Sequence, residues 1–384
     1  MEIRSSHSFS PSAGLPLNSL FHPKEYYHLF CTLQCKDCKK MQDISHFWPK
    51  SLLIQKKVVN LHPTEPATLP VDQRTRAGRF VYIRFMRYNK QPISIANQIA
   101  ILKSRGMVFG NEFEALSVLE NISYFRLAGY WRTMEQDSVQ HLFRAGSKFE
   151  DVVERYRFDS ELKTLIFAAI QKIEISVRTR IIHHFSMAHG AFWFLDSSLA
   201  DDNDLFNANL DFLRAELDRS HDEFITEHFR KYDEPDMPPA WKTLEVASFG
   251  TLSKLYKNMN DNVVKKQVAR SFNIPQHKCM QSWLAALTIV RNTCAHHARL
   301  WNVHLSLVPR MNERMRGKWI TSHSYASDRI YPSLCCIAYW LNAIDDKNSF
   351  VSDFKSLLTK YPTINPALMG FPPSWSQEPL WKRI

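Results

Sequence analysis

Apolar side chains recur at helical spacing along residues 159–189, and this stripe constrains the fold more than any other feature of the sequence. The stripe consists of Leu162, Leu165, Ala169, Ile173, Val177 and Ile181. Gly190 follows directly and is a typical helix stop. The pattern predicts one long amphipathic helix whose apolar face belongs in a core.

The same period runs through most of the remaining chain. Ser94 can cap a helix that stops at Gly106. Pro238-Pro239 can open another helix, which continues through Leu255. Further helical segments are predicted at about 115–122, 149–156, 264–272, 280–298, 330–344 and 350–358. No stretch alternates as a strand does, and the chain has only 10 glycines, so we expect an all-α, multi-helix bundle.

The composition is that of a globular protein, because 384 residues with 45% hydrophobic content can bury a sizeable core. The longest uncharged apolar run, at 333–342, is far shorter than the roughly 20 residues that span a bilayer. The N-terminus lacks the order of a secretory signal, and 7 cysteines without a regular framework suit a reducing compartment. We expect a cytoplasmic protein that does not contact the membrane.

Residues 1–85 differ from the rest of the chain. They contain 7 of the 19 prolines and show no sustained apolar period. One interpretation is a disordered basic tail. The interpretation that we favour is an extension produced by a start codon assigned too early, with translation beginning at Met86. The helical domain is then 86–384.

The motifs of several enzyme classes are missing from the sequence. Cys31, Cys35 and Cys38 lie close together with His28 and His46 nearby, but they lack the paired spacing of a zinc site. Glycine-rich nucleotide-binding motifs and the signatures of metalloproteases and hydrolases do not occur. We therefore expect no metal and no cofactor, ATP and NAD included.

The net charge of +11 favours a polyanionic partner, of which RNA and DNA are the commonest. Residues 1–85 hold 12 Lys and Arg against 6 Asp and Glu, so they supply +6 of this charge and leave +5 for the rest. The basic character therefore halves if that segment is not part of the working protein.

The sequence RNTCAHH, at 291–297, places polar groups on an apolar helix. Arg291 lies on the same predicted face as Leu284, which is part of the apolar stripe. A guanidinium there must be paired or line a wet cleft, because burying it bare costs several kcal/mol. Pairing with a helix glutamate such as Glu174 or Glu245 is the purely structural alternative.

The residue types of this stretch suit RNA cleavage without a metal. Arg291 and His296 form an R-x4-H pattern with the polar Asn292. Imidazole moves protons near neutral pH, guanidinium holds phosphate, and the 2′-hydroxyl of the RNA is the nucleophile. Residues five apart on an ideal helix point about 140° away from each other. We therefore expect either a distorted helix or two copies that combine across a dimer interface.

Several blocks of the sequence, in order, carry a resemblance to a known family. They are Ser94–Gly106, Ile122–Trp131, Ile173–Arg180, Trp241–Tyr256, Arg291–Asn302 and Met369–Trp375. From about Met86 to Trp381 the chain resembles the Abi family of bacterial abortive-infection proteins, the AbiD/AbiF-like group, whose all-α fold contains a HEPN ribonuclease domain. The resemblance begins where the composition changes, which favours a start at Met86.

The resemblance implies a metal-independent endoribonuclease that acts as a homodimer in phage defence or in a toxin module. In some members a small non-coding RNA is the implied partner. The HEPN pattern R-x4-6-H falls on Arg291 and His296, with Asn292 after the arginine, and it also admits His297. The alternative is an RNA-binding or toxin–antitoxin interaction module with little or no catalysis.

A second R-x4-H pattern, from Arg178 to His183, lies on the long helix. Glu174 precedes Arg178 by four residues, so an ordinary exposed ion pair explains this arginine better than a second catalytic centre. We expect a basic surface that faces RNA or packs. The residues expected to contact RNA are Arg126, Arg178, Arg180, His183 and Arg299.

A chain that starts at Met86 is expected to fold and act like the full chain, because residues 1–85 show neither a core pattern nor the family resemblance. Thermal unfolding followed by circular dichroism, together with an RNA-cleavage assay, compares the two chains. Loss of soluble, cooperative folding in the shorter chain would contradict the expectation.

Overall fold

The computed structural model of the chain describes residues 90–322 and 324–382. The predictions for residues 1–85, including the cysteine cluster, and for a start at Met86 lie outside these residues. The described helices are α2 Ile95–Ser104, α3 Glu112–Asn121, α4 Tyr124–Trp131, α5 Phe149–His189, α6 Asn203–Arg219, α7 Glu223–Lys231, α8 Ala240–Val246, α9 Phe249–Asn258, α10 Asn262–Ser271, α11 His277–Ala295, α12 Tyr331–Ile344 and α13 Phe350–Lys360. The prediction of an all-α, multi-helix fold is confirmed.

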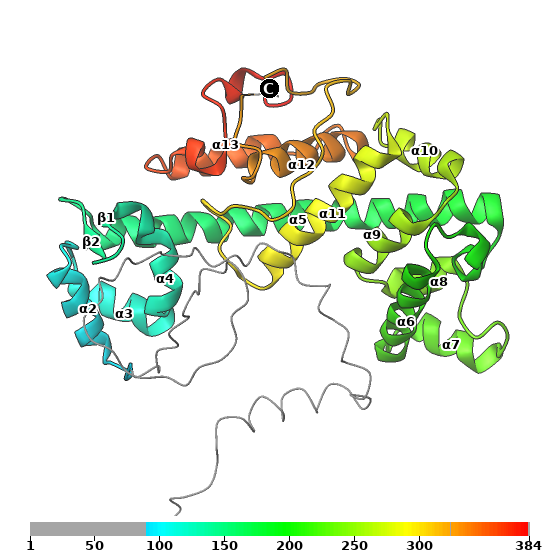
Figure 1. Cartoon of the computed structure of the whole chain (residues 1–384), viewed down its shortest axis with the longest axis horizontal. Coiled ribbons are helices and arrows are strands. Elements are labelled where there is room, and N and C mark those ends of the chain that lie inside the picture. Colours follow the sequence, from blue (N-terminus) through cyan, green and yellow to red (C-terminus); the bar gives the residue numbers. More distant parts are fainter. Residues whose placement is uncertain (1–89, 323, 383–384) are drawn as a thin grey trace, which may run out of the picture. The chain divides into compact units, whose positions relative to one another are not determined.

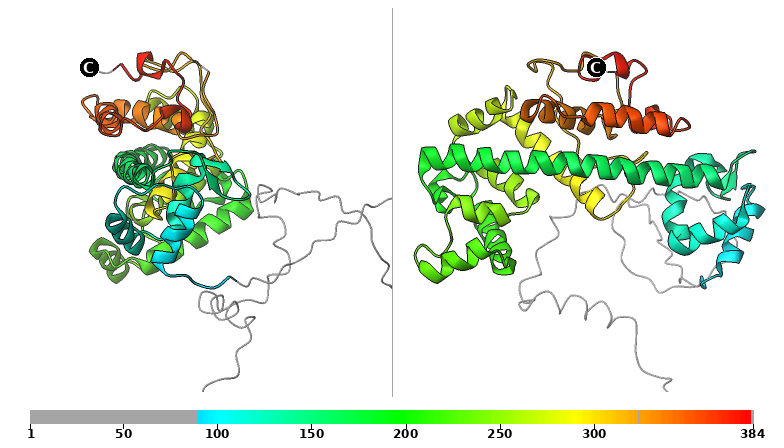
Figure 2. Two further views of the ribbon diagram at one scale, coloured as in Figure 1. Left: turned by 90° about the vertical axis from the view of Figure 1, so that its left-hand side faces the viewer. Right: turned by 180° about the vertical axis from the view of Figure 1, so that it is seen from behind.

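Helix α5 is the element against which most of the others pack (Figure 1). Its 41 residues give a length of about 60 Å at 1.5 Å per residue. Helices α4, α8, α9, α10, α11, α12 and α13 all contact it. The end-on view in Figure 2 places α12 and α13 together on one side of it. The predicted stripe is confirmed, since Leu162, Ile173 and Val177 have no exposed surface.

The start of α5 differs from the prediction. The sequence suggested a short segment near Phe149 and a long helix from Asp159, but one helix runs through both. No glycine or proline separates the two parts, so nothing interrupts the backbone hydrogen bonds. Asp159, a polar residue inside the apolar stripe, is itself completely buried in this helix.

The helix predicted after Pro238-Pro239 is in fact two helices. Helix α8 ends at Val246, and α9 starts at Phe249 after a break at Ala247 and Ser248. The Ser248 hydroxyl accepts a hydrogen bond from the Thr251 backbone N–H at 3.2 Å, which is the contact of an N-cap. This serine makes a new helix start more favourable than a continuous helix.

The sequence prediction missed three helices and a small sheet. Helices α4, α6 and α7 were not expected, although the apolar residues of α6 recur at helical spacing, and Leu210, Leu213 and Leu217 are buried. A two-stranded antiparallel sheet also forms between β1, Glu135–Asp137, and β2, Leu142–Phe143. These strands are too short for a period of two to be recognised in the sequence.

Helix α12 contains the most apolar segment of the chain, and it lies inside the protein. Every residue from Tyr331 to Leu341 is buried, because α12 packs against α5, α11 and α13. In the described part of the chain, no helix combines the length and the hydrophobicity that crossing a membrane requires.

Candidate active site at the end of helix α11

Helix α11 ends inside the motif, at Ala295, and not near Ala298 as predicted. His296 forms the C-cap, and His297 has a positive φ of 54°. The N–H of Ala298 bonds to the Thr293 carbonyl at 3.0 Å, and the N–H of His297 bonds to the Cys294 carbonyl at 3.1 Å. This pair of bonds is the Schellman ending of a helix. Because the chain leaves the helix here, the directions of a straight helix no longer apply to His297.

A buried carboxylate on α5 fixes the chain that follows α11. Asp159 accepts hydrogen bonds from the backbone N–H groups of Leu300, at 3.1 Å, and Trp301, at 2.6 Å. The Tyr130 hydroxyl donates to the same carboxylate at 2.7 Å. Lys163 lies 3.0 Å from Asp159, and its ammonium also donates to the Ala298 carbonyl at 3.2 Å. The segment after the motif therefore has one geometry relative to α5.

Arg126 holds the turn from the opposite side. Its Nη1 donates to the backbone carbonyl of His297 at 2.6 Å. Arg126 lies in the first turn of α4, where the hydroxyl of Ser123 caps the helix by accepting from the Arg126 N–H at 3.3 Å. The arginine predicted to contact RNA thus also positions one of the two histidines.

Arg291 is both paired with a glutamate and open to a cleft, which are the two possibilities that the sequence left open. Its Nε lies 4.0 Å from the Glu174 carboxylate, with 35% of the side chain exposed. The guanidinium lies over the ring of Phe167, 5.8 Å from its centroid. Glu174 also pairs with Arg178 at 2.9 Å, so one carboxylate serves two guanidinium groups. Glu245, the other glutamate considered from the sequence, lies 3.9 Å from Arg178, so two carboxylates face these two guanidinium groups.

Two adjoining hollows run along α5 beside α11. The larger, of about 700 Å³, is lined by Arg126, Tyr156, Ser160, Lys163, Thr164, Phe167, Ala168, Gln171, Cys294, Ala295 and His297. The smaller, of about 340 Å³, is lined by Phe167, Gln171, Glu174, Ile175, Arg178 and Arg291. Phe167 and Gln171 belong to both, so the hollows form one groove, which we call the α5–α11 groove.

The groove brings together part of the predicted catalytic set. Arg291 lies at one end and His297 at the other. Both histidines of the motif are exposed, but only His297 lines the groove. Asn292 is partly buried, and its side-chain oxygen lies 3.4 Å from Nη1 of Arg291.

Arg178 is less accessible than predicted. The expected pair with Glu174 exists, but it is buried and not exposed, because the side chain of Arg178 is only 10% and that of Glu174 only 15% exposed. Arg178 also donates to the Ala247 carbonyl at 2.8 Å, between α8 and α9. This residue joins α5 to the start of α9 and lines the groove with little of its surface.

The other residues predicted to contact RNA, Arg180, Arg299 and His183, lie in different environments. Arg180 donates to the Ser271 carbonyl and stacks on Phe272, with its guanidinium 3.9 Å from the ring centroid. Arg299 donates to the carbonyl groups of Trp301 and Asn302, each at 3.3 Å. His183 is exposed beside His184, whose pKa is lowered by burial and by the neighbouring charges of His183 and Arg180. Arg180 and Arg299 thus donate hydrogen bonds to carbonyl groups within the protein, which leaves fewer donors for RNA.

Sequence reasoning named Glu174 and Arg178 but missed the other residues that α5 contributes to the groove. Asp159, Lys163, Phe167, Gln171 and Glu174 follow one another at intervals of three or four, so they form a single row along the helix. Most of this row is polar, although it adjoins the apolar stripe. A polar row beside a core stripe was visible in the sequence and could have indicated a groove.

Residues 117–302 match the model of a family described as Abi-like protein. This match supports the Abi family. The matched Abi region contains α5, α11, both histidines of the motif and the buried Asp159. Helices α12 and α13 lie outside it. No curated protein and no solved structure matches the chain.

Replacing Asp159 with asparagine should destabilise the protein strongly. The substitution leaves Lys163 with an uncompensated charge in a buried site, which costs about 3–5 kcal/mol. Chemical denaturation measures the loss. Glu161→Gln is the matched control, because Glu161 lies two residues away on α5 in an exposed pair with Lys360, and glutamine keeps an acceptor for the Tyr361 hydroxyl. That change should cost only roughly 0–1 kcal/mol. Equal effects of the two substitutions would contradict the importance of the buried pair.

Proposed function

We propose that this protein is a metal-independent endoribonuclease of HEPN type that acts in abortive-infection defence against phage. The Abi family match supports the defence role. The nuclease activity rests on one observation: a single groove between α5 and α11 is lined by Arg291 and His297 together with an aromatic ring. These are the groups that cleavage of RNA by its own 2′-hydroxyl requires.

In this proposal Arg291 holds the scissile phosphate. Glu174 and the Phe167 ring orient the guanidinium from one side and leave about a third of the side chain open to the groove. Phe167 is 37% exposed, so its ring is also accessible to a nucleotide base. Because guanidinium donates to phosphate in a fixed fork, the same residue stabilises the charge that develops on the pentacoordinate phosphorus.

In this proposal, two imidazole groups carry out the proton transfers. One imidazole takes the proton of the 2′-hydroxyl while that oxygen bonds to phosphorus, and the bond from phosphorus to the 5′-oxygen breaks. The leaving oxygen receives a proton from a second imidazole, so the products are a 2′,3′-cyclic phosphate and a 5′-hydroxyl. The groove favours His297 over His296 for the first role, since His297 is the one that lines it.

We also propose that the second imidazole comes from another copy of the chain. His296 is exposed at the end of α11, where it is available to a partner rather than to its own groove. Ile175 is 56% exposed near Arg291, which gives a twofold contact an apolar side chain that does not occupy the base-binding ring of Phe167. A homodimer with its axis near the motif therefore follows from the exposed groups as well as from the chemistry.

Substitution of the two histidines separates their roles. His297→Asn removes the imidazole but tolerates the positive φ at this position, which asparagine adopts more readily than alanine does. His296→Asn is the matched change at the neighbouring residue. Loss of a general acid or base should lower cleavage of single-stranded RNA by roughly 10²–10⁴-fold with little change in RNA binding. Arg291→Ala should impair both binding and cleavage.

The same assay decides between nuclease and binding module. Cleavage should continue in EDTA and leave 2′,3′-cyclic phosphate ends, because the attacking oxygen belongs to the RNA. If the wild-type protein binds RNA tightly but does not cleave it, the alternative function, an RNA-binding module, is the correct one. If EDTA abolishes cleavage, the activity depends on a metal ion, which would contradict the catalytic roles proposed for Arg291 and the histidines.

Dimerisation should weaken when a charge is placed on the proposed interface. Ile175→Glu introduces a carboxylate at an exposed position, so folding should be unaffected while association falls. Light scattering at micromolar concentration measures the change. Met187→Glu is the matched control, because Met187 is 77% exposed on the same helix and does not line the groove. A wild-type monomer that still cleaves RNA would contradict the dimer.

A further inference from the structure

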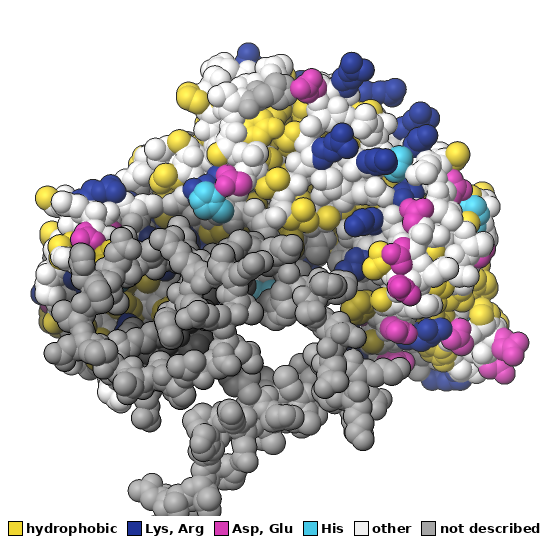
Figure 3. All heavy atoms as spheres, viewed as in Figure 1, with side chains coloured by type: hydrophobic (Ala, Val, Ile, Leu, Met, Phe, Trp, Pro, Cys, Tyr) yellow, Lys and Arg dark blue, Asp and Glu magenta, His cyan; other side chains and the backbone are white. Residues whose placement is uncertain are grey.

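A second basic surface lies at the other end of α11, away from the motif. It is formed by six exposed side chains: Lys266, Arg270, Lys278, Arg310, Arg316 and Lys318. They belong to α10, to the first turn of α11 and to the loop that includes residues 310–318. Figure 3 shows Lys and Arg side chains gathered on this part of the molecule. We call these six residues the basic surface.

Direct contacts connect the elements that carry these residues. Helices α10 and α11 pack against each other. The Arg310 carbonyl accepts a hydrogen bond from the Trp283 indole at 2.9 Å, which fixes the loop to α11. The Tyr339 hydroxyl bonds to the carbonyl groups of Asn273, at 2.9 Å, and Arg316, at 2.8 Å. The loop is thereby fixed to the end of α10 as well.

The cations of the basic surface are not neutralised by the protein. None of the six forms an ion pair with a carboxylate among residues 90–322 and 324–382, whereas Lys103, Lys360 and Arg214 all do. Burial lowers the pKa of His277, and the charges of Lys265, Lys266 and Lys278 lower it further. Lys266 and Lys278 of the basic surface therefore lie near the same imidazole.

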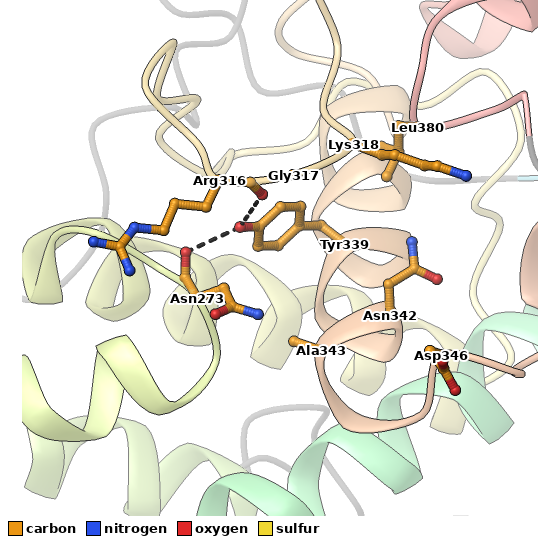
Figure 4. A pocket seen from close by; sticks show the side chains of 9 residues that line it. All are labelled: Asn273, Arg316, Gly317, Lys318, Tyr339, Asn342, Ala343, Asp346 and Leu380. Atoms are coloured by element: carbon orange, nitrogen blue, oxygen red, sulfur yellow. Dashed lines mark hydrogen bonds between the residues drawn. The ribbon is translucent and has the colours of Figure 1, made fainter.

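A polar hollow of about 370 Å³ opens in this surface. In Figure 4, the side chains of Arg316 and Lys318 extend to opposite sides of the Tyr339 ring, and Asn273 lies below Arg316. Asp346, the acidic residue of the lining, lies at the far end of the hollow from Arg316. A hollow with two cations and amide groups suits the phosphate and sugar groups of a nucleic-acid strand.

We infer that the basic surface binds the sugar-phosphate backbone of an RNA strand that also reaches the α5–α11 groove. Helix α11 carries Lys278 near its start and Arg291 near its end; 13 residues of helix span about 20 Å and turn these two side chains about 140° apart, so a strand that contacts both winds partly around the helix. The hollow favours RNA over an acidic protein, because its amide groups suit sugar hydroxyls while its cations suit phosphate. The inference rests on the proposed function and adds a distant anchoring surface to it.

The test measures RNA binding at several salt concentrations. Arg316→Gln/Lys318→Gln removes two charges from the basic surface, and Arg230→Gln/Lys231→Gln removes two exposed charges from α7 as a matched control. A 30-nucleotide single-stranded RNA, labelled at one end, reports affinity by fluorescence anisotropy in the His297→Asn background. Loss of two phosphate contacts should reduce the slope of log K against log salt by about 1.4 and weaken binding on the order of ten-fold. The control should change neither.

The outcomes separate this inference from the proposed function. If the Arg316→Gln/Lys318→Gln protein keeps the wild-type salt slope and affinity, the basic surface does not bind RNA, even if the wild-type protein cleaves RNA. Equal loss in the α7 control, or equal competition by poly-glutamate, would also overturn it. A reduced slope confined to the basic-surface variant supports the inference, including the case in which wild-type protein binds RNA without cleaving it.

Discussion

The buried pair of Asp159 and Lys163 is the interaction on which the candidate site depends. A carboxylate with no exposed surface is tolerated only when its hydrogen-bonding capacity is used, and Asp159 uses it on a tyrosine hydroxyl, a lysine and two backbone N–H groups. Two of these partners, Leu300 and Trp301, belong to the segment after α11. The pair therefore fixes the position of the turn that follows α11.

The continuity of α5 makes this arrangement possible. Asp159 and Lys163 contact the turn after α11, and Glu174 further along the same helix contacts Arg291. A rigid helix fixes the distance between these contacts, so both ends of the motif are placed by one element. The groove between them is a consequence of polar residues on a helix that otherwise packs in the core.

Positive charge is used in two different ways in this protein. Arg178 and Arg180 donate to carbonyl groups inside the structure and hold helices together. Arg316 and Lys318 have no such pairing partner in the described part of the chain and surround a polar hollow. Net charge alone cannot distinguish these uses, because each depends on which carbonyl or carboxylate the fold brings within reach.

The sequence alone determined the helical class, the stripe of α5 and the residue types of the motif, because these depend on local periodicity and on intrinsic chemistry. It could not determine that α11 ends at Ala295 or that α5 begins at Phe149, since helix ends depend on which partners satisfy the terminal backbone groups. The sequence predicted the pair of Glu174 with Arg178 and offered Glu174 for Arg291, but only the tertiary structure shows that one carboxylate serves both arginines and that Arg178 also bonds to Ala247. A sequence specifies which groups can pair, whereas the packing of distant segments selects the pairs that form.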